Sequence, residues 1–186
     1  RQRVFLARHS SHVTNMKTIA IDMDGVLADV LSVFMDLDER DFGRRKTLDE
    51  VWGVPELKAF ERALEYVHRD GFFRSAPVIA DSQDVLYKLN QRYNVYIVSA
   101  ATEYPKSLSE KHAWLNEHFP FITWQQMVFC GSKQIIRADI MIDDHLKNLD
   151  FFPGETILFT QPHNATLEAP RHRRVKSWRD VAALLL

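Results

Sequence analysis

Short apolar runs alternate along this chain with longer stretches in which apolar residues recur every three or four positions. Short runs bounded by turn residues predict buried β-strands, and the longer spacing predicts amphipathic helices. Five strands are expected in this way: Thr18–Asp22, Val95–Ser99, Met127–Phe129, Ile140–Ile142 and, as the last, Thr156–Phe159. Because strands that alternate with helices form parallel sheets through right-handed crossovers, the pattern predicts an α/β fold with helices on both faces of a parallel sheet.

Helical spacing dominates the stretch between the first two predicted strands. Apolar residues recur at helical intervals from Val30 to Gly43, and Pro55 is well placed to open a second helix that ends at Gly71. No strand pattern interrupts residues 30–74. We therefore expect this segment to form a small helical cap, inserted after the first strand and lying over a site at the edge of the sheet.

The flanking residues, 16–29 and 75–186, are expected to form the core of the fold. One predicted helix of this core is Pro105–Phe119. Its apolar side is expected to comprise Leu108, His112, Leu115 and Phe119.

Residues 1–15 do not continue this pattern. They carry three arginines and two histidines but no acidic residue. The apolar run Val4–Ala7 is shorter than the roughly 7–15 residues of a signal-peptide core. Met16 and Lys17 directly precede the first strand and resemble a natural start, so residues 1–15 are expected to be an upstream extension or an expression remnant with little ordered structure.

The composition is that of an ordinary folded domain. Of the 186 residues, 46% are hydrophobic and 26% are charged, which argues against disorder, and the length suits one domain with a sizeable core. The net charge of −1 provides no basic field for a nucleic acid polymer or a membrane surface. A single cysteine, Cys130, cannot form an internal disulfide and fits a reducing compartment. No apolar run approaches the roughly 20 residues of a membrane helix, so a cytoplasmic location is expected.

Two carboxylates, those of Asp22 and Asp24, end the first predicted strand, and Gly25 then allows a sharp turn. Open α/β sheets bind their ligands at the carboxyl ends of the strands. Carboxylates this close together repel each other, which favours a bound cation or an acid/base pair. A solvated turn is the plain alternative for the pair taken alone.

Further polar residues follow the other predicted strands or precede a helical turn. In a parallel sheet such residues meet at one edge although they are far apart in the chain. The set comprises Asp22, Asp24, Ser99, Lys133, Asp143 and Asp144. Its carboxylates suit Mg²⁺, which prefers oxygen ligands, while a hydroxyl and a lysine suit the oxygens of a phosphate group. Phosphoryl transfer requires this kind of positioning and charge neutralisation.

The order of these motifs resembles that of the haloacid dehalogenase superfamily of Mg²⁺-dependent phosphohydrolases, whose fold is a Rossmann-like parallel sheet. Within it, the chain is similar to the 5′(3′)-deoxyribonucleotidases over about residues 17–186. The segments that carry the likeness are Asp22–Asp29, Gly71–Phe73, Ile140–Asp144, Ile157–Thr160, His163–Asn164 and Ser177–Trp178. The resemblance implies hydrolysis of deoxyribonucleoside 5′- or 3′-monophosphates through an aspartyl-phosphate intermediate.

The resemblance also implies a role for each acidic residue. Asp22 would be the nucleophile that attacks phosphorus. Asp24 would be the general acid that protonates the leaving oxygen and then the base that activates water. Mg²⁺ would bind the Asp22 carboxylate, the backbone carbonyl of Asp24 and Asp144. Asp143 would lie behind these ligands or bridge to the ion through water.

Three further positions would hold the phosphate group. Ser99 and the amide of Ala100 would bind its oxygens, and Lys133 would offset its repulsion from the anionic nucleophile. Relatives carry two hydroxyl residues where this chain has Ser99 and Ala100, so one contact would come from the backbone alone.

The candidate substrate pocket lies in the predicted cap and at its start. It comprises Val30, Trp52, Val67 and Phe72, and Val30 replaces an aromatic residue of the relatives. Aromatic faces would suit a nucleobase.

Other functions stay open at this point. A phosphatase of the same superfamily could act on a sugar phosphate or another small phosphoester, and polar groups would then line the cap. A receiver-like or non-catalytic phosphate-binding domain could use the same residue types, although receivers place their acid pair before the phosphorylated aspartate. The expected partner is a small phosphomonoester, and a homodimer is compatible with the sequence.

Overall fold

The computed structural model describes residues 16–186, so the expected N-terminal extension lies outside the described part of the chain. Six strands form one parallel sheet of order β3-β2-β1-β4-β5-β6. The strands are β1 Thr18–Ile21, β2 Asn94–Ser99, β3 Met127–Phe129, β4 Ile140–Asp143, β5 Glu155–Phe159 and β6 Arg173–Val175. The expected fold class, an α/β fold with a parallel sheet, is confirmed.

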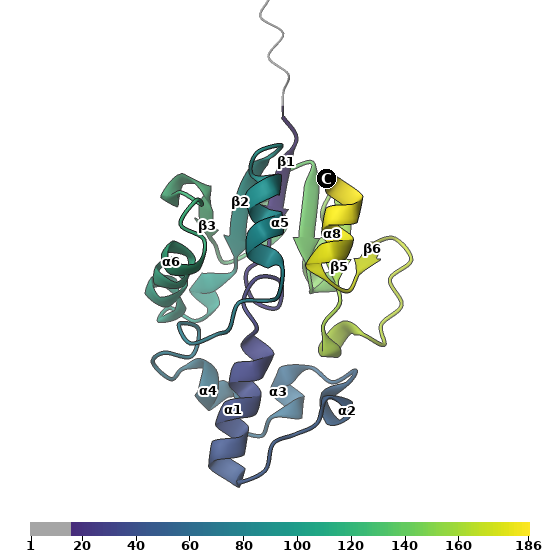
Figure 1. Cartoon of the computed structure of the whole chain (residues 1–186). Coiled ribbons are helices and arrows are strands. Elements are labelled where there is room, and N and C mark those ends of the chain that lie inside the picture. The colour runs from purple at the N-terminus through teal and green to yellow at the C-terminus, as the bar shows by residue number, and fades with distance from the viewer. Residues whose placement is uncertain (1–15) are drawn as a thin grey trace, which may run out of the picture.

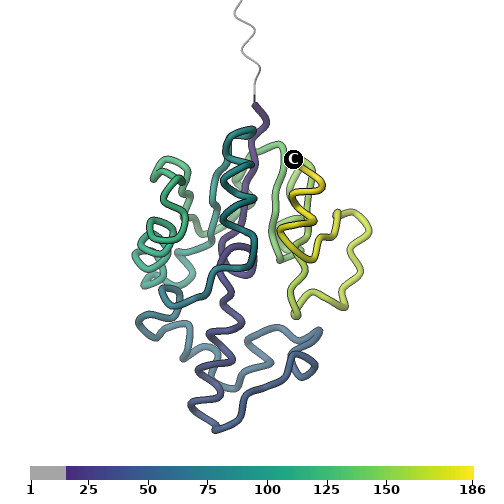
Figure 2. Tube along the Cα trace, viewed as in Figure 1, coloured from purple at the N-terminus to yellow at the C-terminus, as the bar shows by residue number. Residues whose placement is uncertain are grey.

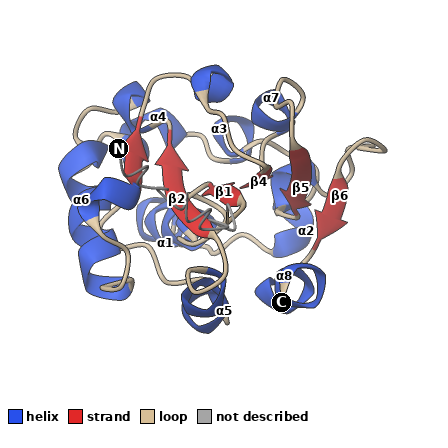
Figure 3. Cartoon of the chain, turned by 90° about the horizontal axis from the view of Figure 1, so that it is seen from above, coloured by secondary structure: helices blue, strands red, loops and turns tan. Residues whose placement is uncertain are grey.

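Helices cover the two faces of the sheet unequally (Figure 3). The core helices are α5 Ser82–Leu89, α6 Ser107–His118, α7 Leu146–Leu149 and α8 Trp178–Leu185. Helices α5, α6 and α8 pack on the face to which Ile19 and Ile21 point. The face of Ala20 is covered by the single short helix α7 and by loops. Among the described residues, none of the helices combines the length and the apolar character that crossing a bilayer requires.

The helical cap lies beyond the carboxyl ends of the strands, at the end of the molecule opposite the start of β1 (Figures 1 and 2). Its helices are α1 Val30–Phe42, α2 Leu48–Val51, α3 Glu56–Ala59 and α4 Ala63–Val67. The first predicted helix is present and ends as expected at Gly43, which adopts a left-handed conformation with a φ of 73°. The second predicted helix is divided at Phe60, which leaves helical geometry and buries its ring against that of Phe34.

Two expectations about the core are wrong. Thr156–Phe159 does not form the last strand, because Arg173–Val175 pairs with it and makes the edge of the sheet. In α6, Lys111 and Trp114 lie on the buried side, whereas His112 is exposed. Leu115 and Phe119 are buried as expected, so the error concerns His112, because a search for apolar spacing passes over a buried lysine.

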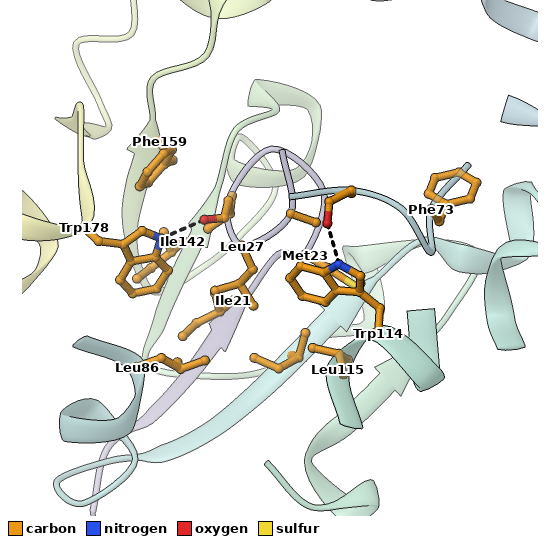
Figure 4. Close-up of a cluster of buried hydrophobic side chains, with 14 of the residues drawn as sticks. Ile21, Met23, Leu27, Phe73, Leu86, Trp114, Leu115, Ile142, Phe159 and Trp178 are labelled. Atoms are coloured by element: carbon orange, nitrogen blue, oxygen red, sulfur yellow. Dashed lines mark hydrogen bonds between the residues drawn. The ribbon is translucent and has the colours of Figure 1, made fainter. Parts of the chain in front are cut away.

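Two buried tryptophans form hydrogen bonds to the segments that join the cap to the core (Figure 4). Nε1 of Trp178 donates to the carbonyl of Val26 at 2.7 Å, and Nε1 of Trp114 donates to the carbonyl of Ala76 at 2.7 Å. Val26 lies in the turn before the cap, and Ala76 lies in the segment that returns from it. Each indole therefore satisfies a carbonyl and fixes one of the two connections.

The turn after β1 depends on Gly25. Its φ of 71° lies in the left-handed region, which favours glycine. A Cβ atom at this position would lie 2.2 Å from Oδ2 of Asp144. The close approach of this turn to the end of β4 therefore requires a residue without a side chain.

We expect Gly25→Ala to destabilise the protein far more than Gly43→Ala, its matched control. Both positions have a positive φ, but no atom lies within 4 Å of a Cβ built at Gly43. The left-handed conformation costs alanine about 1–2 kcal/mol, and Gly25→Ala must also displace the buried Asp144 side chain. Urea denaturation followed by circular dichroism measures both losses in the free energy of unfolding. Equal losses would contradict this steric argument.

Candidate active site

The parallel register brings the predicted polar residues to one edge of the sheet. Ile21 of β1 pairs with Ile97 on one side and with Ile142 on the other. The backbone N–H of Asp22 donates to the carbonyl of Ile142 at 2.9 Å, so Asp22 and Asp143 leave their strands side by side.

Asp22, Asp143 and Asp144 are buried and offer carboxylate oxygens that all lie within 4.8 Å of one another. The Nζ atom of Lys133 lies 2.6 Å from both Asp22 Oδ1 and Asp143 Oδ2. Asp143 also accepts a hydrogen bond from the backbone N–H of His145 at 2.8 Å. Lys133 thus connects the candidate nucleophile to Asp143, and no lysine within residues 16–186 forms an ion pair with Asp144.

Burial and mutual repulsion disfavour the ionised forms of this cluster. Burial, followed by the charge of Asp143, raises the pKa of Asp22 and the pKa of Asp144 well above their usual range. Burial lowers the pKa of Lys133, but the charges of Asp22 and Asp143 outweigh it and raise that pKa. The buried Oδ1 atom of Asp144 has no hydrogen-bond partner among the described residues. One lysine cannot neutralise three carboxylates, so the cluster fits a hard divalent cation such as Mg²⁺.

Lys111 is a site residue that the sequence pattern misses. Its Nζ atom donates to Asp24 Oδ2 at 2.5 Å and to Ser99 Oγ at 2.9 Å. The same atom lies 4.4 Å from the centre of the Phe73 ring, and the side chain is 3% exposed. The signal in the sequence is a lysine three residues before Trp114 on the buried side of a helix, where a charge requires partners.

A cavity of about 270 Å³ lies over these residues, between the edge of the sheet and the cap. The predicted site residues that line it are Asp22, Asp24, Ser99, Ala100, Lys133 and Asp144, together with Val30, Val67 and Phe72 of the predicted pocket. Phe34, Phe73 and Tyr104 add further aromatic surface. Asp143 is fully buried and does not line the cavity.

Trp52 does not line this cavity, contrary to the expected pocket. Its side chain is 51% exposed and follows the last residue of α2. The next residue, Gly53, donates its N–H to the carbonyl of Pro162 at 2.8 Å. The backbone of this turn therefore faces the core, while the indole lies at the surface.

A second group of metal-ligating side chains, Asp144, His145 and His163, lies at the same edge. Nδ1 of His163 lies 2.9 Å from Glu56 Oε1, and Nε2 lies 3.1 Å from the carbonyl oxygen of Asp144. Burial lowers the pKa of His163, but the hydrogen bond to Glu56 and the charge of Asp144 outweigh it and raise the pKa to about 9. Both ring nitrogens face oxygen atoms of neighbouring residues, so His163 supports Asp144 instead of binding a metal.

Residues 15–186 match a family model described as 5′ nucleotidase, deoxy (pyrimidine), cytosolic type C protein. The 5′(3′)-deoxyribonucleotidase of Bacillus subtilis strain 168 is 42% identical over 174 residues, which cover 91% of this chain and 99% of that protein. Among solved structures, a haloacid dehalogenase-like family hydrolase from Streptococcus pneumoniae has a TM-score of 0.62 at 14% identity, covering 93% of this chain and 100% of that one.

A magnesium-bound haloacid dehalogenase-type hydrolase from Bacillus subtilis has a TM-score of 0.58 at 14% identity, covering 92% of this chain and 99% of that one. Likeness at this identity shows the fold, which is the one that the motif order predicts. The family model matches nearly the whole chain, and the Bacillus subtilis deoxyribonucleotidase is similar over almost its full length. These two findings identify the family as well as the fold. They show that this chain belongs to the deoxy (pyrimidine) 5′ nucleotidase family of cytosolic type C and is a phosphoric monoester hydrolase.

Proposed function

We propose that this chain hydrolyses deoxyribonucleoside 5′- or 3′-monophosphates in the cytoplasm, with Mg²⁺ and through an aspartyl-phosphate intermediate. The observation that carries the proposal is a single cavity lined both by buried charged groups and by an aromatic wall. The charged groups suit a phosphate, and the wall suits a nucleobase. The substrate named for the Bacillus subtilis relative supports the same class.

Mg²⁺ would be held by the carboxylates of Asp22 and Asp144 and by the backbone carbonyl of Asp24. When bound, the ion supplies positive charge next to the phosphate oxygens. Asp143 would support this set from behind, since Lys133, the backbone N–H of His145 and the side-chain amide of Asn148 already occupy its oxygens. The magnesium described for a structural relative supports the choice of cation.

Asp22 is the nucleophile in this proposal. One of its carboxylate oxygens attacks phosphorus, a bond from that oxygen to phosphorus forms, and the bond from phosphorus to the nucleoside oxygen breaks. Lys133, 2.6 Å from Asp22 Oδ1, offsets the repulsion between the two anions. Ser99 and the amide of Ala100 bind the phosphate oxygens from the wall of the cavity.

Asp24 acts as the general acid and then as the base. It donates a proton to the leaving nucleoside oxygen, and it later takes a proton from the water that attacks phosphorus and releases Asp22. Lys111 holds Asp24 Oδ2, while Oδ1 has no hydrogen-bond partner within residues 16–186. Lys111 therefore orients the carboxylate and leaves one oxygen to carry the proton.

The aromatic side chains of the cavity form a connected wall. The ring of Phe72 lies edge-on to that of Phe34, with centres 4.8 Å apart, and edge-on to that of Phe73, with centres 4.9 Å apart. Such a wall offers flat apolar surface to a nucleobase, whereas a sugar would require polar partners there. The wall therefore favours a nucleotide over a sugar phosphate.

Release of inorganic phosphate from a panel of monophosphates tests this proposal. We expect the highest rates with deoxyribonucleoside 5′- or 3′-monophosphates, lower rates with ribonucleotides and sugar phosphates, and no release in the presence of a chelator. Asp22→Asn, which keeps the size of the side chain, should abolish turnover while circular dichroism shows an intact fold. Release from sugar phosphates alone would overturn the substrate, and turnover by Asp22→Asn would overturn the nucleophile.

Lys111→Met should lower the rate of the first step by about a hundredfold for an alkyl phosphate, because Asp24 is no longer oriented to donate its proton. A nitrophenyl phosphate should be affected much less, since its leaving group requires no proton. Lys106→Met is the control, because Lys106 precedes the same helix and forms an exposed ion pair with Asp70. Single-turnover kinetics measures both rates. An equal loss with the two substrates would show that Lys111 does not act through Asp24.

A further inference from the structure

The first contact between the cap and the core lies at α6 and is firmly anchored. The carboxylate of Glu110 in α6 accepts hydrogen bonds from three backbone N–H groups within residues 71–74, at 2.6, 3.0 and 3.1 Å. Trp114 of the same helix donates to the carbonyl of Ala76 at 2.7 Å. Because hydrogen bonds to a charged group are among the strong ones, this end of the cap is held to the core.

The second contact lies at the other end of the cap, against the 3₁₀ helix η4 (Pro162–Asn164), where the turn after α2 meets the segment after β5 (Figure 2). The N–H of Gly53 donates to the carbonyl of Pro162 at 2.8 Å. Glu56 of α3 lies 2.9 Å from Nδ1 of His163. This contact has fewer hydrogen bonds than the first, so opening of the cap at this end would cost less.

His163 connects this second contact to the candidate cation site. Its Nε2 donates to the carbonyl of Asp144 at 3.1 Å and lies 3.7 Å from Asp144 Oδ2. The neighbouring Asn164 donates to the same carbonyl at 2.8 Å. The His163 side chain is 7% exposed, so little water is available to replace a lost partner. Loss of Glu56 would therefore loosen the ring that helps to hold Asp144.

We propose that Glu56 is a positioning residue that acts through His163 on Asp144, so that docking of the cap and binding of Mg²⁺ stabilise each other. The inference rests on the proposed function, because it requires a cation at Asp144. Coupling of this kind is reciprocal. If docking of Glu56 tightens the binding of the cation, the cation favours the docked cap by the same factor.

Calorimetric titration of the full chain with MgCl₂ measures one direction of this coupling, the effect of Glu56 on the affinity for Mg²⁺. Glu56→Ala should bind Mg²⁺ about tenfold more weakly than the unchanged protein, as is typical when a residue that supports a metal ligand is lost. Glu56→Gln keeps the size and one acceptor oxygen and should give an intermediate affinity. Glu65→Gln is the matched control, because Glu65 belongs to the same cap but forms an exposed ion pair with Arg62. Its affinity should be unchanged.

Hydrogen exchange of residues 52–60 measures the other direction of this coupling, the effect of Mg²⁺ on docking of the cap. Mg²⁺ should slow exchange of this segment in the unchanged protein and in Glu65→Gln, but not in Glu56→Ala. A merely structural role of Glu56 would speed exchange equally with and without Mg²⁺. Unchanged affinity and unchanged Mg²⁺ protection in Glu56→Ala would overturn this inference alone. Absence of Mg²⁺ binding by the unchanged protein would overturn the proposed function together with it.

Discussion

The burial of three carboxylates beside one lysine is the constraint on which this structure depends. Moving a charged group out of water costs several kcal/mol even after the protein relaxes, so Asp22, Asp143 and Asp144 require partners close at hand. Lys133 lies 2.6 Å from two of them and supplies one positive charge. The negative charge that is left can attract a divalent cation, as the proposed reaction requires.

Backbone geometry holds these charges together. Pairing of β1 with both β2 and β4 sets Asp22 beside Asp143, and Gly25 lets the following turn approach Asp144. Helix α6 then joins this edge to the cap through two consecutive residues. Glu110 binds the backbone that returns from the cap, and Lys111 binds Asp24 and Ser99. One helix thus connects the backbone that leaves the cap to the carboxylate of Asp24.

Much of this arrangement follows from local features of the sequence. The strand pattern and the acidic motifs at strand ends predict the parallel sheet and its site, because strand periodicity and residue order are properties of short segments. Asp22, Asp24, Ser99 and Lys133 meet at one cavity as expected, since carboxyl ends of parallel strands share an edge. The order of these motifs along the chain was also enough to identify the resemblance to the 5′(3′)-deoxyribonucleotidases, which the family match confirms.

The tertiary structure alone decided the features that depend on distant partners. Lys111 resembles a surface lysine until packing brings it to Asp24, which lies 87 positions away. Arg173–Val175 becomes a strand only by pairing with β5, and Trp52 is excluded from the cavity by the way its turn docks on the core. Glu56 and His163 lie 107 positions apart and meet only when the cap is folded onto the sheet. By itself, the sequence determined which polar residues stand at the strand ends, whereas three-dimensional packing decided which partners orient them, because burial and charge pairing depend on the whole fold.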